Sequence, residues 1–177
     1  MDRRAWLARL AALAAAGAWR APAPAQAPRE VVDSAGRRVK VPPRASRVFA
    51  SGPPASILVF AVAPDTLLGW TTPFRPSERP YIPAKYAGLP ATGRLTGRGN
   101  TANVELVVAS RPDVIVDYGS INDTYASLAD RVQQQTGIPY LLLDGSFDAI
   151  PASLRTTGSL TGRDADADAL ARYAIDT

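Results

Sequence analysis

The sequence contains no cysteine and no histidine among its 177 residues. The missing cysteines exclude disulfide bonds, thiolate zinc sites and cysteine-held iron–sulfur clusters, and the missing histidines exclude the usual zinc site. Neither a Ser-His nor a Cys-His catalytic pair can be built from this chain. We therefore expect a binding protein rather than an enzyme, with no resident metal or cofactor.

Positive charge is also scarce beyond the N-terminal segment. The formal net charge is +4, but residues 1–25 contain four arginines and a single acid, Asp2. The remainder is nearly neutral, and its longest basic run is Arg37-Arg38. Because nucleic-acid binding needs a basic patch or stripe, the sequence predicts no nucleic-acid partner.

Long apolar runs are missing too, apart from a short alanine- and leucine-rich stretch near the start. Residues 1–27 have a basic beginning, this apolar middle and small residues before a cleavage point after Ala25 or Ala27, which is the anatomy of a signal peptide. Arg3-Arg4, followed after a spacer by two bulky apolar residues, resembles a twin-arginine export signal. No later run approaches the roughly 18 apolar residues of a membrane span, and a chain without cysteine cannot carry a lipoprotein anchor. We expect an exported, soluble, periplasmic protein.

The mature chain alternates strand and helix patterns. The predicted order is a β-hairpin at 30–41, a strand at 47–50, a helix at 55–63, a strand at 67–70, a helix ending before Pro112, a strand at 114–116, a helix at 122–136, a strand at 138–143, and helices at 148–160 and 164–175. Helices that feed buried strands through short turns build parallel sheets covered by helices on both faces. The sequence predicts an α/β fold, a Rossmann-like lobe over residues 28–160 with a parallel central sheet and an N-terminal β-hairpin.

The loops at the carboxyl ends of the strands should form the binding edge of such a sheet. They fall at residues 51–54, 71–100, 118–121 and 144–147. The second of these loops is too long to be structureless inside a compact domain without a function. Ligand contacts are therefore expected there.

Four segments stand in a recognisable order behind the signal peptide. They are VVDSAGRRVKVPPRASRV at 31–48, GRLTGRGNTANVELVVASRPDVIVDYGS at 93–120, QQTGIPYLLLDG at 134–145 and GSLTGRDADADALARYA at 158–174. With them the chain resembles the N-terminal lobe of the ABC-transporter substrate-binding proteins for iron–siderophore, haem and cobalamin uptake. The resemblance covers roughly residues 30–176.

That resemblance implies two Rossmann-like lobes joined by one long helix, with the ligand held between the lobes. Residues 161–177 look like the start of the joining helix, and no second lobe follows them. The chain is therefore expected to be half of a two-lobe protein. It is either a fragment of a longer chain or a truncated lobe that transports nothing.

The implied function is to capture an iron chelate, siderophore or haem-like, and to deliver it to an ABC permease in the inner membrane. No bond is made or broken, and a monomer is the default state for such a carrier. An alternative ligand for the same fold is an oxyanion such as molybdate, captured by backbone N–H groups and Arg98 near the helix start at Asn103.

Six residues on the predicted binding edge are candidate ligand contacts: Trp70, Arg75, Tyr81, Arg94, Arg98 and Tyr118. Arginine forks and aromatic faces suit anionic, flat or rounded chelates whose metal already has its ligands. Glu105 matches the acid that, in the family the chain resembles, docks into an arginine pocket on the permease. An exposed carboxylate can pair with a guanidinium in this way.

Four further carboxylates stand next to strand ends: Asp113, Asp117, Asp144 and Asp148. Two of them could in principle form an acid pair or a metal site. Asp113 more simply caps the turn before its strand, and Asp144-Gly145 is typical of a turn. No catalytic role and no metal site are assigned to them.

Overall fold

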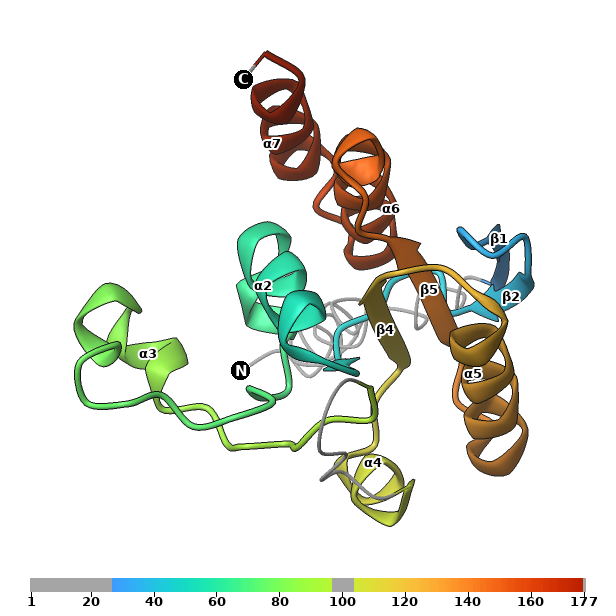
Figure 1. Ribbon diagram of the computed structural model, residues 1–177, viewed down its shortest axis with the longest axis horizontal. Helices are drawn as coiled ribbons and strands as arrows, with labels where there is room; N and C mark the ends of the chain where they lie inside the picture. The colour runs from blue at the N-terminus through green and yellow to red at the C-terminus, as the bar shows by residue number, and fades with distance from the viewer. Residues whose placement is uncertain (1–26, 97–103, 177) are drawn as a thin grey trace, which may run out of the picture.

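β4 (Val114–Gly119) is the central strand of a parallel three-stranded sheet, flanked by β3 (Val48–Ala50) and β5 (Tyr140–Asp144). The computed structural model describes residues 27–96 and 104–176 (Figure 1). The predicted signal peptide lies outside the described residues, apart from residue 27. The prediction of an α/β fold with a parallel central sheet is confirmed.

The strand residues alternate between two faces and build two separate hydrophobic cores. Val114 and Val116 contribute to one core, whereas Ile115 between them contributes to the other. All three side chains are fully buried. Burial on both faces explains why these strands read in the sequence as continuous apolar runs.

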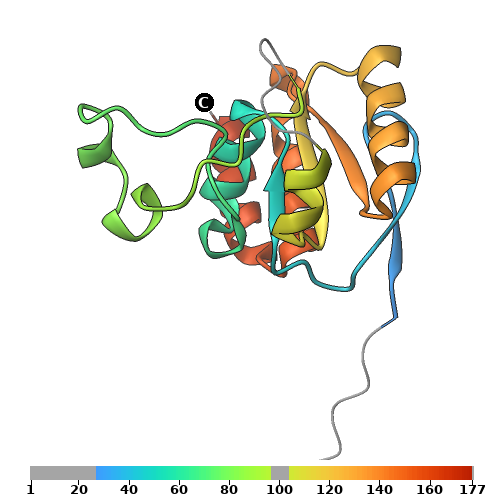
Figure 2. The same cartoon turned by 90° about the horizontal axis from the view of Figure 1, so that it is seen from below.

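Helices cover both faces of the sheet, as predicted (Figures 1 and 2). The first core is closed by α2 (Pro53–Val62), α6 (Ile150–Thr161) and α7 (Asp164–Asp176), and the second by α4 (Val104–Ser110) and α5 (Asp123–Thr136). Short 3-10 turns occur at η1 (Pro64–Thr66) and η3 (Phe147–Ala149). The helix predicted from residue 148 thus begins as a 3-10 turn. Within the described ranges, no helix has the length and apolar character needed to cross a membrane.

The N-terminal β-hairpin closes the outer edge of β5. It is formed by the antiparallel strands β1 (Arg29–Val32) and β2 (Arg38–Val41), in agreement with the prediction. Its turn bonds to the edge strand: Ser34 N–H donates to Leu142 O at 2.9 Å, and Leu142 N–H donates to Asp33 Oδ2 at 3.2 Å. These bonds satisfy backbone groups that an open edge strand would leave unpaired.

The prediction of a continuous strand at residues 67–70 is wrong. Only isolated bridges form there, between Leu67 and Val48 and between Trp70 and Ala91. The chain leaves the sheet after Leu67, and Trp70 pairs instead with the far end of a long excursion, residues 71–92. The excursion contains η2 (Arg79–Tyr81) and α3 (Ala84–Ala87) and extends away from the sheet (Figure 2).

An aromatic cluster anchors the base of the excursion. Trp70 packs against Phe60 and Phe74, with ring centroids 5.2 and 4.7 Å apart, and its indole N–H donates to Tyr86 O at 2.8 Å. The hydroxyl of Tyr86 donates to Asp65 Oδ1 at 2.9 Å. The excursion is therefore tied to α2 and η1 at its base.

Gly69→Ala should loosen this anchor. A Cβ at position 69 would collide with Pro90 O and lie 2.6 Å from Thr92 Cγ2, so the paired segments would have to separate. We expect the free energy of unfolding, measured by urea denaturation, to fall by about 1–3 kcal/mol. Gly88→Ala in α3's cap is the matched control, because its Cβ would meet only Ala84 O at 3.6 Å. Equal effects of the two substitutions would contradict the anchoring role.

Candidate functional site

A groove of about 220 Å³ lies at the carboxyl end of β4. It is lined by Gly52, Pro53, Pro54, Thr96, Asp117, Tyr118, Gly119, Ser120 and Tyr125. Three of the four predicted binding-edge loops contribute to it. Ligands of open α/β sheets bind at this edge, so we take the groove as the candidate functional site.

Backbone hydrogen bonds from Ser51 assemble the side of the groove that follows β3. Ser51 N–H donates to Val116 O at 2.9 Å, which continues the pairing with β4. Ser51 O in turn accepts from the N–H groups of Leu95 and Thr96, at 2.7 and 3.2 Å. Gly52 permits this approach, because a Cβ there would lie 2.9 Å from Thr96 Oγ1.

The start of α5 forms the opposite side. Asn122 caps this helix through its side-chain oxygen, which accepts from Tyr125 N–H at 3.2 Å. The helix ends at Gly137, which has φ +70° and donates its N–H to Gln133 O. Both ends agree with the sequence prediction. The cap fixes Tyr125 beside Ser120 at the groove.

The floor of the groove is a buried carboxylate held by hydroxyl groups. Asp117 is only 8% exposed. Its Oδ1 accepts from Thr96 Oγ1 at 3.3 Å, and its Oδ2 accepts from the Tyr140 hydroxyl at 3.3 Å. The Ser51 hydroxyl also bonds to this carboxylate and lies 3.2 Å from Thr96 Oγ1. The floor therefore joins residues from four segments of the chain.

Burial sets the protonation behaviour of this floor. Desolvation raises the pKa of Asp117, and the hydroxyls of Ser51, Tyr140 and Thr96 oppose that rise only in part. Burial, together with the neighbouring charge of Asp117, raises the pKa of Tyr140 well above its ordinary value. Burial and the charge of Asp144 raise the pKa of Tyr118. Each of these tyrosines is therefore a neutral hydrogen-bonding group.

The start of α2 is poor in hydrogen-bond donors. Pro53 and Pro54 occupy the first turn and carry no backbone N–H, and Gly52 makes no side-chain cap. Helix N-termini attract anions chiefly through free N–H groups. This helix start therefore offers an anion few donors, and the carboxylate of Asp117 lies on the same groove.

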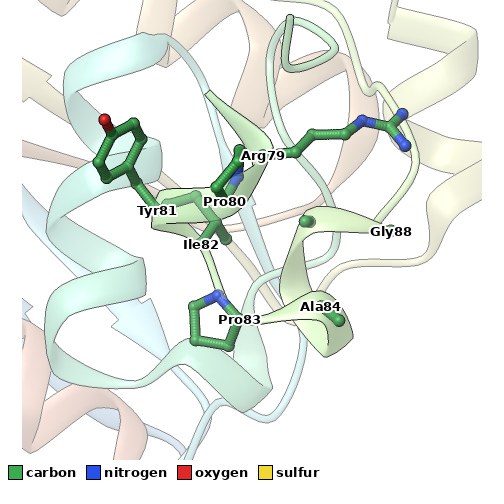
Figure 3. Close-up of a pocket in the computed structure, with 8 residues that line it drawn as sticks. Arg79, Pro80, Tyr81, Ile82, Pro83, Ala84 and Gly88 are labelled. Atoms are coloured by element: carbon green, nitrogen blue, oxygen red, sulfur yellow. The ribbon is translucent and has the colours of Figure 1, made fainter. Parts of the chain in front are cut away.

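A larger, open groove of about 690 Å³ lies on the excursion. Among the described residues, those that line it all belong to the segment 79–88. Figure 3 shows that the side chains of Arg79 and Tyr81 point in opposite directions. The smaller groove draws on several segments at the sheet edge and contains a buried charged group. For these reasons the smaller groove is the better candidate site.

Of the five predicted ligand contacts that the structure describes, it brings one, Tyr118, into the groove. Trp70 is 4% exposed and belongs to the core, and Tyr81 is 86% exposed on the excursion. Arg75 is exposed and lies close to Glu78, with 3.9 Å between Arg75 Nε and Glu78 Oε1. Arg94 is partly buried in the segment that returns from the excursion.

Two other predictions concern Arg98 and Glu105. Arg98 lies outside the described residues, so its predicted role as a ligand contact stays a prediction. Glu105 is exposed in the first turn of α4, beside the exposed apolar residues Leu106 and Val108. This exposure is what a docking residue needs.

The strand-end carboxylates separate into structural and site residues. Asp113 Oδ2 accepts from the N–H groups of Ser46 and Arg47, so it caps the segment before β3 rather than its own turn. Asp144 Oδ1 accepts from Ser146 N–H at 2.8 Å, which confirms the predicted turn. Asp117 enters the groove, a role the sequence reasoning missed although a charged residue at the end of an apolar strand marks it. Among the described residues, no group of three or more acids gathers as a metal site.

Comparison with known proteins supports the fold. No family model matches the chain, and no curated protein matches it. Solved structures do match. An ABC transporter solute-binding protein from Sulfurospirillum deleyianum superposes with a TM-score of 0.67 at 24% identity, covering 81% of this chain and 45% of that protein.

Two further solved proteins show the range of ligands bound by this fold. A molybdate periplasmic binding protein of a Haemophilus influenzae ABC transporter, with molybdate bound, gives a TM-score of 0.65 at 15% identity and covers 84% of this chain and 51% of its own. The haem-binding protein HmuT gives a TM-score of 0.57 at 19% identity. The match covers 88% of this chain and 47% of HmuT. The chain spans about half the length of these proteins. At these sequence identities the structural similarity establishes the α/β fold of the lobe. It does not identify the ligand or the partner of this chain.

The raised pKa of Asp117 predicts a pH-dependent contribution to stability. The folded protein binds this proton at a pH where the unfolded chain does not. Ionised Asp117 therefore costs stability at neutral pH, and the cost is relieved as the pH falls towards the pKa of an unfolded aspartate. Relative to Asp117→Asn, the wild-type chain should gain stability as the pH falls through that window, as measured by urea denaturation at a series of pH values. Glu30→Gln, an exposed acid on β1, is the control, and a pH-independent difference for Asp117→Asn would contradict the assignment.

Proposed function

We propose that the chain is the ligand-binding lobe of the extracytoplasmic solute-binding component of an ABC importer. The observation that carries this proposal is a groove at the carboxyl edge of the sheet, in a lobe whose fold matches half of several solute-binding proteins. The described lining of the groove contains no assembled nucleophile and base, and histidine and cysteine are absent from the chain. Capture and release of an intact solute fits these residues better than catalysis does.

The proposed solute is an iron chelate, siderophore or haem-like. A metal that arrives with its own ligands needs none from the protein, and this chain has neither histidine nor cysteine to offer. Tyr118, Tyr125, Pro53 and Pro54 give the groove aromatic and apolar sides against which an organic chelator can pack. The solved neighbours include a haem binder, which supports a large chelate as the cargo of this fold.

The alternative oxyanion ligand has less support at this groove. Two prolines remove N–H donors from the start of α2, and the buried carboxylate of Asp117 would repel an anion. The other proposed place of capture, near Arg98 and Asn103, lies outside the described residues. Because a molybdate-binding protein has the same fold, molybdate must be included in any binding assay of this chain.

Delivery requires a surface that meets the membrane permease, and we assign Glu105 to it. Its exposed carboxylate at the start of α4 is placed to pair with a guanidinium, and the exposed Leu106 and Val108 add apolar area beside it. In the same proposal, α7 begins the helix that joins this lobe to a second one, and the protein works as a periplasmic monomer.

Tyr118→Ala tests the ligand site. Binding of haemin, a ferric trihydroxamate and molybdate is measured by calorimetry on the full-length protein from its host. We expect at least one iron chelate to bind, and Tyr118→Ala to weaken it about tenfold, or about 1.4 kcal/mol, because an aromatic contact is lost. Tyr173→Ala removes an exposed tyrosine of α7 and serves as the control. Tight binding of molybdate alone would contradict the proposed ligand class. So would a loss of chelate affinity in Tyr118→Ala no larger than that in the control.

Glu105→Ala tests delivery separately from capture. The substitution should leave chelate affinity within about twofold and reduce uptake by the host at least about fivefold, since a charged rim contact steers docking. Uptake of the radiolabelled iron chelate by the host measures delivery, and calorimetry of the purified variant measures chelate affinity. Glu30→Ala on the hairpin removes an equal charge elsewhere. A large loss of affinity in Glu105→Ala would contradict the docking role.

A further inference from the structure

The groove has an acidic floor. Of the described residues that line it, Asp117 is the sole charged one. A second carboxylate, Asp144, is close enough to Tyr118 to raise that tyrosine's pKa. The part of the site that the structure describes is therefore electronegative, although arginine-rich contacts to an anionic ligand were expected.

Among the described residues, Asp117 is held by uncharged donors: the hydroxyls of Ser51, Tyr140 and Thr96 and the backbone N–H of Tyr118. A hydroxyl group that donates to a carboxylate usually does so at about 2.5–2.7 Å. The hydroxyls of Thr96 and Tyr140 stand at 3.3 Å from the Asp117 oxygens. Within residues 27–96 and 104–176, Asp117 makes no ion pair. Buried charges are normally paired with an opposite charge. Asp117 has no such partner among the described residues, so a cationic donor on a ligand can supply one.

Arg75, one of the predicted arginine contacts, and Arg79, which follows it in the same loop, are directed elsewhere. The backbone N–H of Arg75 donates to Glu78 Oε2 at 2.8 Å. The Arg75 guanidinium also faces this glutamate, with 3.9 Å between Arg75 Nε and Glu78 Oε1. Arg79 lines the groove of the excursion, and its side chain extends away from Tyr81 (Figure 3). Neither residue is among those that line the groove over Asp117.

The size of the groove limits what enters it. Pockets that enclose a whole drug-sized ligand have volumes of about 300–1,000 Å³. At about 220 Å³, this groove accommodates one end of a chelate rather than the whole molecule. The group recognised here is therefore a pendant part of the ligand, and the metal centre lies outside it.

We propose that Asp117 is the specificity-determining residue of this groove, and that it selects a metal chelate whose buried end presents a cationic hydrogen-bond donor. The inference rests on the proposed function and narrows its substrate class from chelates in general to those with a pendant cationic group. The donor hydrogen-bonds and pairs with the carboxylate, while the neighbouring chain of the ligand packs against Tyr118, Tyr125 and the two prolines.

The test uses one ferric trihydroxamate with three pendant ends. Ferric desferrioxamine B carries a terminal ammonium; acetylation makes that end neutral, and succinylation makes it anionic. Affinities of the full-length protein should fall in the order ammonium, acetyl, succinyl, with at least about tenfold between the first and the last. Tightest binding of the succinyl form would overturn the inference.

Two variants separate Asp117 from the general charge of the protein. Asp117→Asn should remove most of the preference for the ammonium form and change affinity for the acetyl form by less than about twofold. Thr96→Val deletes one hydroxyl donor and leaves the carboxylate in place, so the preference for the ammonium form should persist or grow. If Asp117→Asn does not fold, Thr96→Val still tests the inference. Glu30→Gln removes the same charge on the hairpin and should change nothing. An unchanged order in Asp117→Asn, or a preference lost in Thr96→Val, contradicts the inference.

A failure of the proposed function is distinguishable from a failure of this inference. If none of the three chelates binds, the iron-chelate proposal fails, and the groove is then probed with butylammonium and butyrate. Amide chemical shifts of Gly119 and Ser120, followed by NMR, should move with butylammonium and not with butyrate. Equal shifts, or none, would overturn the acidic donor-selective site as well.

Discussion

Parallel pairing of β4 to strands on both sides is the constraint on which the rest of the structure depends. The ladder continues past the strand ends, because Ser51 N–H donates to Val116 O and Gly145 N–H donates to Gly119 O. Parallel strands bring their carboxyl ends to one edge, so the segments after β3 and β4 must meet there. The groove follows from this pairing: its residues come from segments far apart in the sequence, and the sheet holds them together.

Placing Asp117 at the end of a buried strand opposes stability. A carboxylate in this position loses hydration, which is why its pKa is raised, and hydroxyl partners at 3.3 Å recover only part of the loss. An apolar residue would suit the strand better on packing grounds alone. Residues that cost stability at the edge of a well-packed sheet are characteristic of functional sites, where a ligand supplies the missing interaction.

Local patterns in the sequence were enough for most of the fold. The apolar run of β4 and the cap and glycine of α5 predicted their elements because short-range forces determine them. The segment 67–70 misled the prediction, since its apolar residues serve the aromatic cluster and pair with residues 90–92 rather than forming a strand. The floor of the groove was not predictable in this way. Thr96 reaches Asp117 only because Ser51 O binds its N–H, a contact between segments that no periodicity records.

The contrast between the two grooves bears on how such a lobe could tell ligands apart. The groove on the excursion is large but built from one segment, so it offers surface without converging groups. The groove over Asp117 is small, but walls from several segments surround one buried acceptor that has no cationic partner among the described residues. A chelated metal is hidden from the protein by its own ligands, so recognition must fall on the organic shell. Packing against that shell supplies affinity with little discrimination, whereas a buried acceptor rejects any ligand that cannot satisfy it. On the proposal made above, selectivity in this lobe depends on the carboxylate at the end of β4 more than on the area of contact around it.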